Sequence, residues 1–249
     1  MIMRCIHLLL MIPRNHLDKK LTLQMRNMAP PVTLILGLTI SFAAFDWLMS
    51  LDPHWYSTVF GVYVFAGGTQ AMFALLVLIT VQLQERGYLK RVSTVEHRHD
   101  IGKFLFAFTV FYAYIGFCQY FLIWYANIPE ETIFFRHRWE ENWKAVSMLL
   151  LFTRFLIPFF LLLSRHTKRH PVAVSIGAGI VLFAHYVDHY WMVMPTIDEH
   201  AARFSWINLA GLAAPVGIFL FWLAQRLSKD PIYPLKDPKL AATYKNVNL

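Results

Sequence analysis

Six long apolar segments constrain the fold of this chain more than any other feature of its sequence. They lie at about 32–50, 60–82, 102–126, 143–164, 172–194 and 205–226, each bounded by polar residues or prolines. A helix of about 20 apolar residues is long enough to cross the hydrocarbon core of a bilayer. The segments lack the alternation of apolar and polar residues that a membrane β-strand shows, so we predict helices. The expected fold class is an all-α integral membrane bundle of about six transmembrane helices.

The composition agrees with a membrane protein. Of the 249 residues, 57% are hydrophobic and only 15% are charged, whereas soluble domains carry about a quarter of charged residues. An ordinary soluble domain and a disordered chain are both excluded. Cys5 and Cys118 are the two cysteines, too few for a disulfide framework or a cysteine-ligated cluster. In so apolar a chain, the net charge of +8 indicates contact with the lipid membrane and no nucleic-acid partner.

The distribution of lysine and arginine predicts the orientation. The N-terminus, the 84–103 and 165–171 connections and the C-terminal tail together hold 18 of them, and the opposite side holds four. Because cytoplasmic loops are enriched in these residues, both termini are expected in the cytoplasm of a multi-pass protein. We predict a cytoplasmic leader over 1–30, a six-helix membrane domain over 31–228 and a cytoplasmic tail over 229–249.

Ionisable residues inside the segments are the main functional candidates, because a buried charge in a membrane costs several kcal/mol and needs a partner or a function. At 1.5 Å per residue, Arg154 lies ~16 Å and Asp188 ~9 Å from the outer ends of their segments. We therefore expect the two to pair if the fourth and fifth segments pack as an antiparallel hairpin. His185, Asp188 and His189 stand at i, i+3 and i+4 and share a helix face. Asp46, in the first segment, is the fifth candidate.

These residues leave three interpretations open. Arg154 and Asp188 could be a structural ion pair, or the group could form a protonatable chain beside a polar cavity. Haem ligation is the third, although one helix cannot supply both axial ligands of one haem. Pro158 cannot donate a hydrogen bond to the Arg154 carbonyl, which frees that oxygen beside the buried charge. The run 97–100, His-Arg-His-Asp, is interpreted as a solvated loop cluster, so no metal site is predicted.

The outward end of the first segment is the other informative region. Asp52, His54 and Trp55 follow Asp46 within nine residues. Aromatic residues are expected at the membrane–water interface, but that explanation does not cover an acid one turn inside it. We expect this group to form an outer exit for protons or to lie near a quinone.

Three strings resemble the NrfD-like membrane subunits of alternative complex III, within the polysulphide reductase membrane-subunit superfamily. They are FAAFDWLMSLDPHWYSTVFGVY (42–63), EHRHDIGKFLFAFTVFYAYIGFCQYFLIWYANIPEE (96–131) and HYVDHYWMVMP (185–195). The resemblance covers roughly residues 21–230. Members of that family carry further membrane helices before the matching segment. We therefore expect either a fragment or a second polypeptide that supplies the missing helices.

The resemblance implies a subunit of a bacterial quinol:cytochrome c oxidoreductase in the cytoplasmic membrane. Such a subunit is not expected to be catalytic alone. It would bind no haem or metal, and quinone or quinol is its candidate ligand. The implied partners are a multihaem cytochrome c, an iron–sulfur subunit and a sister NrfD-like subunit. The family pattern matches Asp46, His54, Arg154, His185 and Asp188 here.

Two functions follow as expectations. The first is a proton pathway through Asp188, His185, His189, Arg154 and Asp46, with a quinone pocket beside it. The alternative is a non-catalytic membrane anchor for the haem and iron–sulfur subunits. An independent transporter is disfavoured, because the chain has no paired inverted half.

Overall fold

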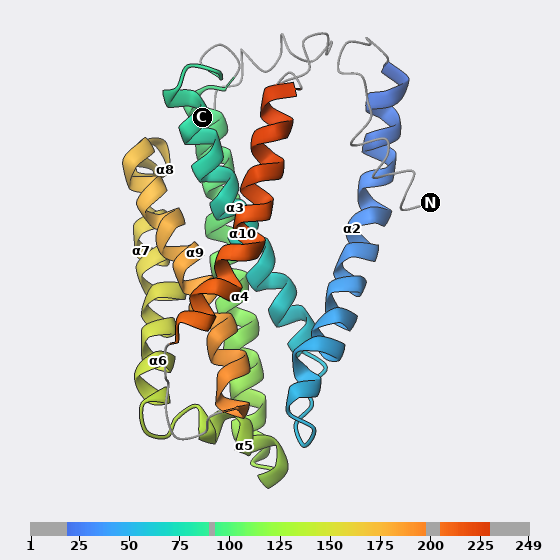
Figure 1. Ribbon diagram of the computed structural model, residues 1–249, viewed down its shortest axis with the longest axis vertical. Coiled ribbons are helices and arrows are strands. Elements are labelled where there is room, and N and C mark those ends of the chain that lie inside the picture. Colours follow the sequence, from blue (N-terminus) through green and yellow to red (C-terminus); the bar gives the residue numbers. More distant parts are fainter. Residues whose placement is uncertain (1–18, 90–92, 198–204, 230–249) are drawn as a thin grey trace.

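The computed structural model describes residues 19–89, 93–197 and 205–229 (Figure 1). Within these ranges every regular element is helical and none is a strand. Six helical segments are long and apolar enough to cross a membrane, at Arg26–Leu51, Phe60–Glu85, Val95–Ala126, Trp143–Leu163, Pro171–Thr196 and Trp206–Lys229. The expected all-α, multi-pass membrane fold is confirmed.

The fourth span is the only one of the described spans that changes helix type in its middle. It runs through α6 (Trp143–Leu150), a π-helical turn η2 (Leu151–Leu156) and α7 (Ile157–Leu163). The other elements are α2 (Lys19–Trp47), η1 (Met49–Leu51), α3 (Phe60–Glu85), α4 (Val95–Ala126), α5 (Pro129–His137), α8 (Arg165–Arg169), α9 (Pro171–Val193), η3 (Met194–Thr196) and α10 (Trp206–Lys229).

Four of the spans form an antiparallel bundle, in which α3, α4, α6–α7 and α9 each pack against two of the other three. The helix α2 packs on α3 near one end and diverges from it towards the other (Figure 1). None of the residues of α10 is buried, and a hydrogen bond from Tyr186 Oη to Asn208 O, 3.0 Å, joins it to α9. We call the end that holds α5 the outer end and the end that holds α8 the inner end, following the predicted orientation.

Two boundaries differ from the sequence prediction. The first span was expected to begin after the leader at Pro30–Pro31, but α2 starts at Lys19 and continues through both prolines. The carbonyls that lose their donors to these prolines belong to Arg26 and Asn27, which are exposed and can bind water at the inner end. Residues 1–18 of the predicted leader and 230–249 of the predicted tail lie outside the described residues.

The second difference is at the start of α4, which begins at Val95, seven residues before the predicted span. Thr94 and His97 form a capping box, in which the Thr94 side chain accepts from the His97 backbone N–H and the Thr94 backbone N–H donates to His97 Nδ1 at 3.2 Å. The run 97–100 therefore lies in the first two turns of α4, and its interpretation as a solvated loop is wrong. Arg98 and His99 are buried there, at 8% and 7% exposure.

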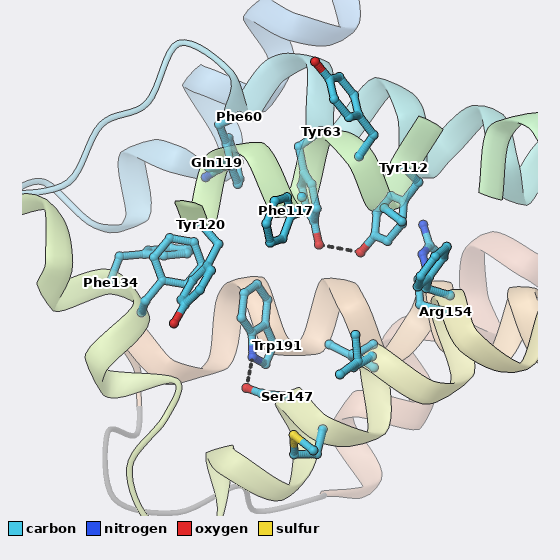
Figure 2. A pocket seen from close by; sticks show the side chains of 18 of the residues that line it. Phe60, Tyr63, Tyr112, Phe117, Gln119, Tyr120, Phe134, Ser147, Arg154 and Trp191 are labelled. Atoms are coloured by element: carbon cyan, nitrogen blue, oxygen red, sulfur yellow. Dashed lines mark hydrogen bonds between the residues drawn. The ribbon is translucent and has the colours of Figure 1, made fainter. Parts of the chain in front are cut away.

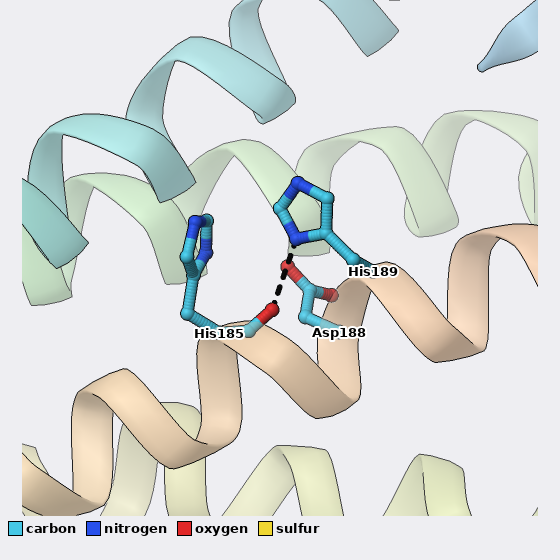
Figure 3. Close-up of side chains that lie close together, drawn as sticks. All are labelled: His185, Asp188 and His189. Carbon is cyan, nitrogen blue, oxygen red and sulfur yellow. Dashed lines mark hydrogen bonds between the residues drawn. The ribbon is translucent and has the colours of Figure 1, made fainter. Parts of the chain in front are cut away.

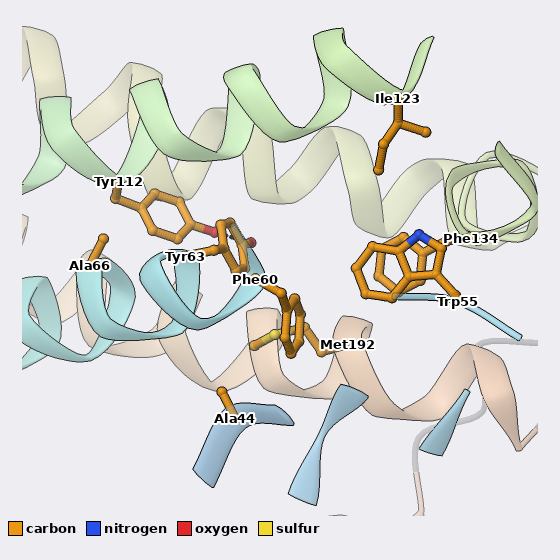
Figure 4. Close-up of a cluster of buried hydrophobic side chains, with 9 residues drawn as sticks. All are labelled: Ala44, Trp55, Phe60, Tyr63, Ala66, Tyr112, Ile123, Phe134 and Met192. Carbon is orange, nitrogen blue, oxygen red and sulfur yellow. Dashed lines mark hydrogen bonds between the residues drawn. The ribbon is translucent and has the colours of Figure 1, made fainter. Parts of the chain in front are cut away.

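Two apolar clusters fill the bundle, one in each half. The outer cluster is largely aromatic (Figure 4) and consists of Ala44, Trp55, Phe60, Tyr63, Ala66, Tyr112, Ile123, Phe134 and Met192. The inner cluster is aliphatic and consists of Ala74, Val77, Val81, Leu105, Leu162, Val174, Ala178 and Val181. The buried polar side chains of Gln70, Thr109, Arg154 and Asp188 belong to neither cluster. This polar layer is the candidate functional site.

Candidate functional site

The buried ion pair predicted from the sequence is present. Arg154 Nη2, on η2, lies 3.7 Å from Asp188 Oδ2, on α9, and each residue is about 1% exposed. The fourth and fifth spans pack side by side, as the pairing requires. Because an arginine stays protonated and a buried charge needs a counter-charge, Asp188 is a carboxylate in this state.

Two tyrosines extend this pair into a chain of hydrogen bonds. Tyr63 on α3 donates its hydroxyl proton to Asp188 Oδ1 at 2.7 Å, and its oxygen lies 2.5 Å from the hydroxyl of Tyr112 on α4. A phenol has one proton to donate, and a carboxylate can only accept. Since Tyr63 donates to Asp188, Tyr112 must donate to Tyr63. The lone pairs of the Tyr112 oxygen are then left to accept a proton from another group.

The guanidinium of Arg154 is positioned mainly by the groups that pack around it. Its central carbon lies 4.3 Å from the centre of the Tyr112 ring, a cation–π contact, and Nη1 is 3.5 Å from the carbonyl of Val181. Gly67 makes room for it, because a Cβ at that position would lie 2.7 Å from Nη2. Nε and Nη2 have no hydrogen-bond partner among the described residues. The charge is therefore enclosed but not fully satisfied.

The π-helical turn explains how the backbone accommodates this charge. Ile157 N–H donates to the carbonyl of Phe152, five residues back, and Pro158 follows at the start of α7. The Arg154 carbonyl, freed by Pro158 as predicted, accepts instead from Gln70 Nε2 at 3.4 Å. The same Gln70 nitrogen lies 3.0 Å from Thr109 Oγ1. Single π-turns inside α-helices are frequent at functional sites.

His185 and His189 lie next to Asp188, on the face predicted for them (Figure 3). Their ring centres are 4.5 Å apart, and His189 Nδ1 is 2.9 Å from the carbonyl of His185. Ligand atoms of these three residues lie within 4.8 Å of one another, close enough to hold a metal ion. Both Asp188 oxygens, however, already face Tyr63 and Arg154, and a cation here would be repelled by the guanidinium. The geometry therefore does not favour a metal ion at this cluster.

A cavity of about 660 Å³ adjoins the polar layer on the side of α4 and α6 (Figure 2). Its wall is mostly aromatic and apolar, and it includes the side chains of Tyr63, Tyr112 and Arg154. The other residues that contribute polar atoms to it include Gln119, Tyr120, Ser147 and Trp191. Trp191 Nε1 donates to Ser147 Oγ at 2.7 Å, which fixes the indole in the wall. Clefts of this size and composition are typical of sites for small apolar ligands.

The outer residues singled out from the sequence do not all join this site. Asp46, on α2, and His54 are exposed, and neither lines the cavity. Trp55 is buried and stacks on Phe134, with ring centres 3.8 Å apart and planes at 14°. Because Phe134 lines the cavity, Trp55 supports its outer wall. Asp52 is half-buried and influences Arg138. The geometry gives the inclusion of Asp46 in the proton pathway no support.

Arg138 is a second fully buried arginine, at 1% exposure, and follows α5 at the outer end. It donates to three backbone carbonyls: Nε to Trp191 O at 3.2 Å, Nη1 to Phe134 O at 2.8 Å, and Nη2 to Met192 O at 2.9 Å. Burial lowers the pKa of its guanidinium to about 9, against the opposing effect of Asp52. At neutral pH the side chain is a cation that joins α5 to the end of α9.

Sequence reasoning missed Tyr63, Tyr112, Gln70 and Arg138. A signal existed for Gln70, since an amide in the middle of an apolar span needs a hydrogen-bond partner. The two tyrosines carried no signal, because aromatic residues are frequent throughout the spans. Arg138 was counted only as one of the four outer cations.

No protein-family model matches the chain, and no curated protein matches it.

Proposed function

We propose that this chain is a quinol-binding membrane subunit of a bacterial respiratory quinol:cytochrome c oxidoreductase of the alternative complex III kind. One observation carries the proposal: Tyr63, Tyr112 and Arg154 belong both to the wall of the cavity and to the buried polar layer. A ring in this cavity would meet a chain of hydrogen bonds that ends on a carboxylate. The resemblance of the three strings to NrfD-like subunits supports the same class of protein.

The cavity suits a hydroquinone. This ligand has a flat aromatic ring with a hydroxyl on two opposite edges and an apolar tail. The aromatic side chains of the wall, among them Phe60, Phe117 and Phe134, can stack on or abut such a ring. The polar groups are few and lie at particular points of the wall, which is how small-molecule sites obtain orientation.

The direction of the hydrogen bonds supports proton transfer from the ligand to Asp188. A hydroquinone hydroxyl can donate to the Tyr112 oxygen, since Tyr112 donates to Tyr63 and Tyr63 donates to Asp188. A concerted shift along this chain would leave both tyrosines neutral and Asp188 protonated. Arg154 would then lack its counter-charge, a costly state that favours onward transfer. His185, one turn away on α9 with no hydrogen-bond partner for Nδ1 among the described residues, is the next acceptor, and His189 follows.

Oxidation of a hydroquinone releases two electrons and two protons. In this proposal the electrons pass to a haem or iron–sulfur centre of a partner subunit, one proton follows the Tyr112–Tyr63–Asp188 chain, and the second leaves from the other ring oxygen. The inner cluster favours release towards the outer end. Val77, Leu105, Leu162 and four further members of that cluster are fully buried and offer no polar atom for proton transfer.

A scaffold is the second candidate, and the exposure of the peripheral helices favours it. The apolar helix α10 has no buried residue, and α2 is largely exposed apart from its contact with α3. Lipid or a partner subunit would cover these faces in the membrane. A scaffold without chemistry would tolerate any substitution in the polar layer that left assembly intact.

The experiment that separates the two is the turnover of the assembled complex with Tyr63→Phe and Asp188→Asn. Each substitution interrupts the hydrogen-bond chain with little change of shape. Loss of a positioned proton acceptor lowers rates by about 10²–10⁴, so quinol oxidation should fall at least a hundredfold. Tyr186→Phe is the matched control, because this hydroxyl binds a carbonyl of α10 outside the chain and should leave turnover unchanged. Normal turnover of an assembled complex with Tyr63→Phe and with Asp188→Asn overturns the proposed function.

A further inference from the structure

Gln119 is a buried polar residue that the hydrogen-bond chain leaves unused. It lies on α4, is 5% exposed and lines the cavity. Its amide makes no hydrogen bond to another described residue, and its atoms are accessible from the cavity and not sealed inside the protein. An amide at membrane depth that makes no hydrogen bond to the protein needs a partner in the cavity, because the hydrocarbon region offers no bulk water. Such a group in the wall of a cavity is expected to form a hydrogen bond with the ligand.

The position of Gln119 on α4 relates it to Tyr112. Tyr112, Gly116 and Gln119 stand at i, i+4 and i+7, so they share one face of the helix over about 10 Å. All three line the cavity. Gly116 lets the Tyr63 ring lie against the backbone of α4, because a Cβ there would be 3.3 Å from Tyr63 Cε2. Figure 2 shows Gln119 and Tyr112 on opposite sides of Tyr63 and Phe117. The cavity therefore has a polar group towards each end of one wall.

We propose that Gln119 binds the second ring oxygen of the ligand, so that the cavity recognises a ring with oxygens on two opposite edges. This inference rests on the proposed function and specifies its substrate. One oxygen would donate to Tyr112, and the opposite one would face the Gln119 amide. An amide offers both a donor and an acceptor, so Gln119 can bind a hydroxyl before oxidation and a carbonyl after it. The Tyr112 hydroxyl can only accept a hydrogen bond from the ligand, because it donates its own proton to Tyr63.

The test compares two ligands that differ by one oxygen. The full chain in lipid nanodiscs is titrated with decylhydroquinone and with a decylphenol that lacks the second hydroxyl. Quenching of Trp139 and Trp191, which line the cavity, reports binding. One hydrogen bond to a buried amide corresponds to about tenfold in affinity. The unsubstituted protein should therefore bind the diol about tenfold more tightly than the phenol.

Gln119→Met, which keeps the length of the side chain without its amide, should remove this preference by weakening the diol alone. Gln119→Asn, with a shorter amide, tests the same point if the first variant fails to assemble, and it should reduce the preference. Met72→Leu is the matched control, since this exposed methionine of α3 lies outside the cavity lining, and it should leave both affinities unchanged. In the assembled complex, Gln119→Met should raise KM for quinol about tenfold with little change in kcat, because the contact is made before and after the reaction.

The outcomes separate the two proposals. If the unsubstituted protein binds neither ligand, the quinol-binding function itself fails. If it binds both and Gln119→Met keeps the full preference for the diol, the role of Gln119 is overturned and the proposed function stands.

Discussion

Two buried arginines, Arg154 and Arg138, differ in the groups that compensate their charge. Both are about 1% exposed. Arg138, at the outer end, uses all three of its guanidinium nitrogens on backbone carbonyls. Arg154, in the middle of the bundle, faces the Asp188 carboxylate at 3.7 Å and leaves Nε and Nη2 without hydrogen-bond partners among the described residues.

Under the proposed function, the difference separates a structural cation, Arg138, from a cation beside the proton-transfer chain, Arg154. Backbone carbonyls cannot titrate, so the environment of Arg138 stays fixed when a ligand binds or a proton moves. The environment of Arg154 changes as soon as Asp188 gains or loses a proton. A buried pair with incomplete hydrogen bonding stabilises a fold poorly, which favours a role in chemistry for this position.

The largest effect on stability is expected from Arg138→Met. The substitution removes three charge-assisted hydrogen bonds, each worth about 1.5–3 kcal/mol, and leaves three carbonyls without donors. We expect a loss of roughly 5 kcal/mol, measured as a lower thermal midpoint in nanodiscs. Arg136→Met is the control, because its exposed pair with Glu140 is worth about 1 kcal/mol or less. Equal midpoints for the two variants would show that Arg138 does not hold α5 to α9.

A somewhat smaller effect is expected from Arg154→Met, and it should be reversible by a second substitution. Removal of one member of a buried pair costs about 3–5 kcal/mol, whereas removal of both is often neutral. The double variant with Asp188→Leu should therefore recover most of the thermal midpoint and still fail to oxidise quinol in the complex. Recovery of turnover together with stability would assign the pair a purely structural role.

The residues that could be predicted from the sequence are those that stand out from their own neighbours along the chain. A charge within an apolar span is unusual on its own, and counting residues from the outer ends was sufficient to bring Arg154 and Asp188 to similar depths. The helical spans follow for the same reason, since their length and hydropathy need no knowledge of neighbours.

The residues that it could not predict acquire their role from another helix. Tyr63 and Tyr112 are 49 positions apart and meet only because α3 and α4 pack together. Asp46, like Asp188, is an acidic residue within an apolar segment. It lies on α2, outside the four-helix bundle, and is exposed. Burial of Arg138 depends on the end of α9, more than 50 positions away. A charge count along the chain contains no information about such contacts.

The smallest and most specific test uses two neighbouring glycines of α3. A Cβ on Gly67 would lie 2.7 Å from Arg154 Nη2, whereas a Cβ on Gly68 would meet nothing within 4 Å. In a helix, Gly→Ala adds about 0.5–1 kcal/mol of stability where there is room. Gly68→Ala should therefore raise the thermal midpoint slightly at unchanged turnover. Gly67→Ala should not raise the thermal midpoint, since the added methyl displaces the guanidinium. It should also slow quinol oxidation, because the Arg154–Asp188 contact is altered. If both variants behaved alike in stability and turnover, the position of the guanidinium would not matter to the reaction, and Arg154 would belong with Arg138 as a structural cation.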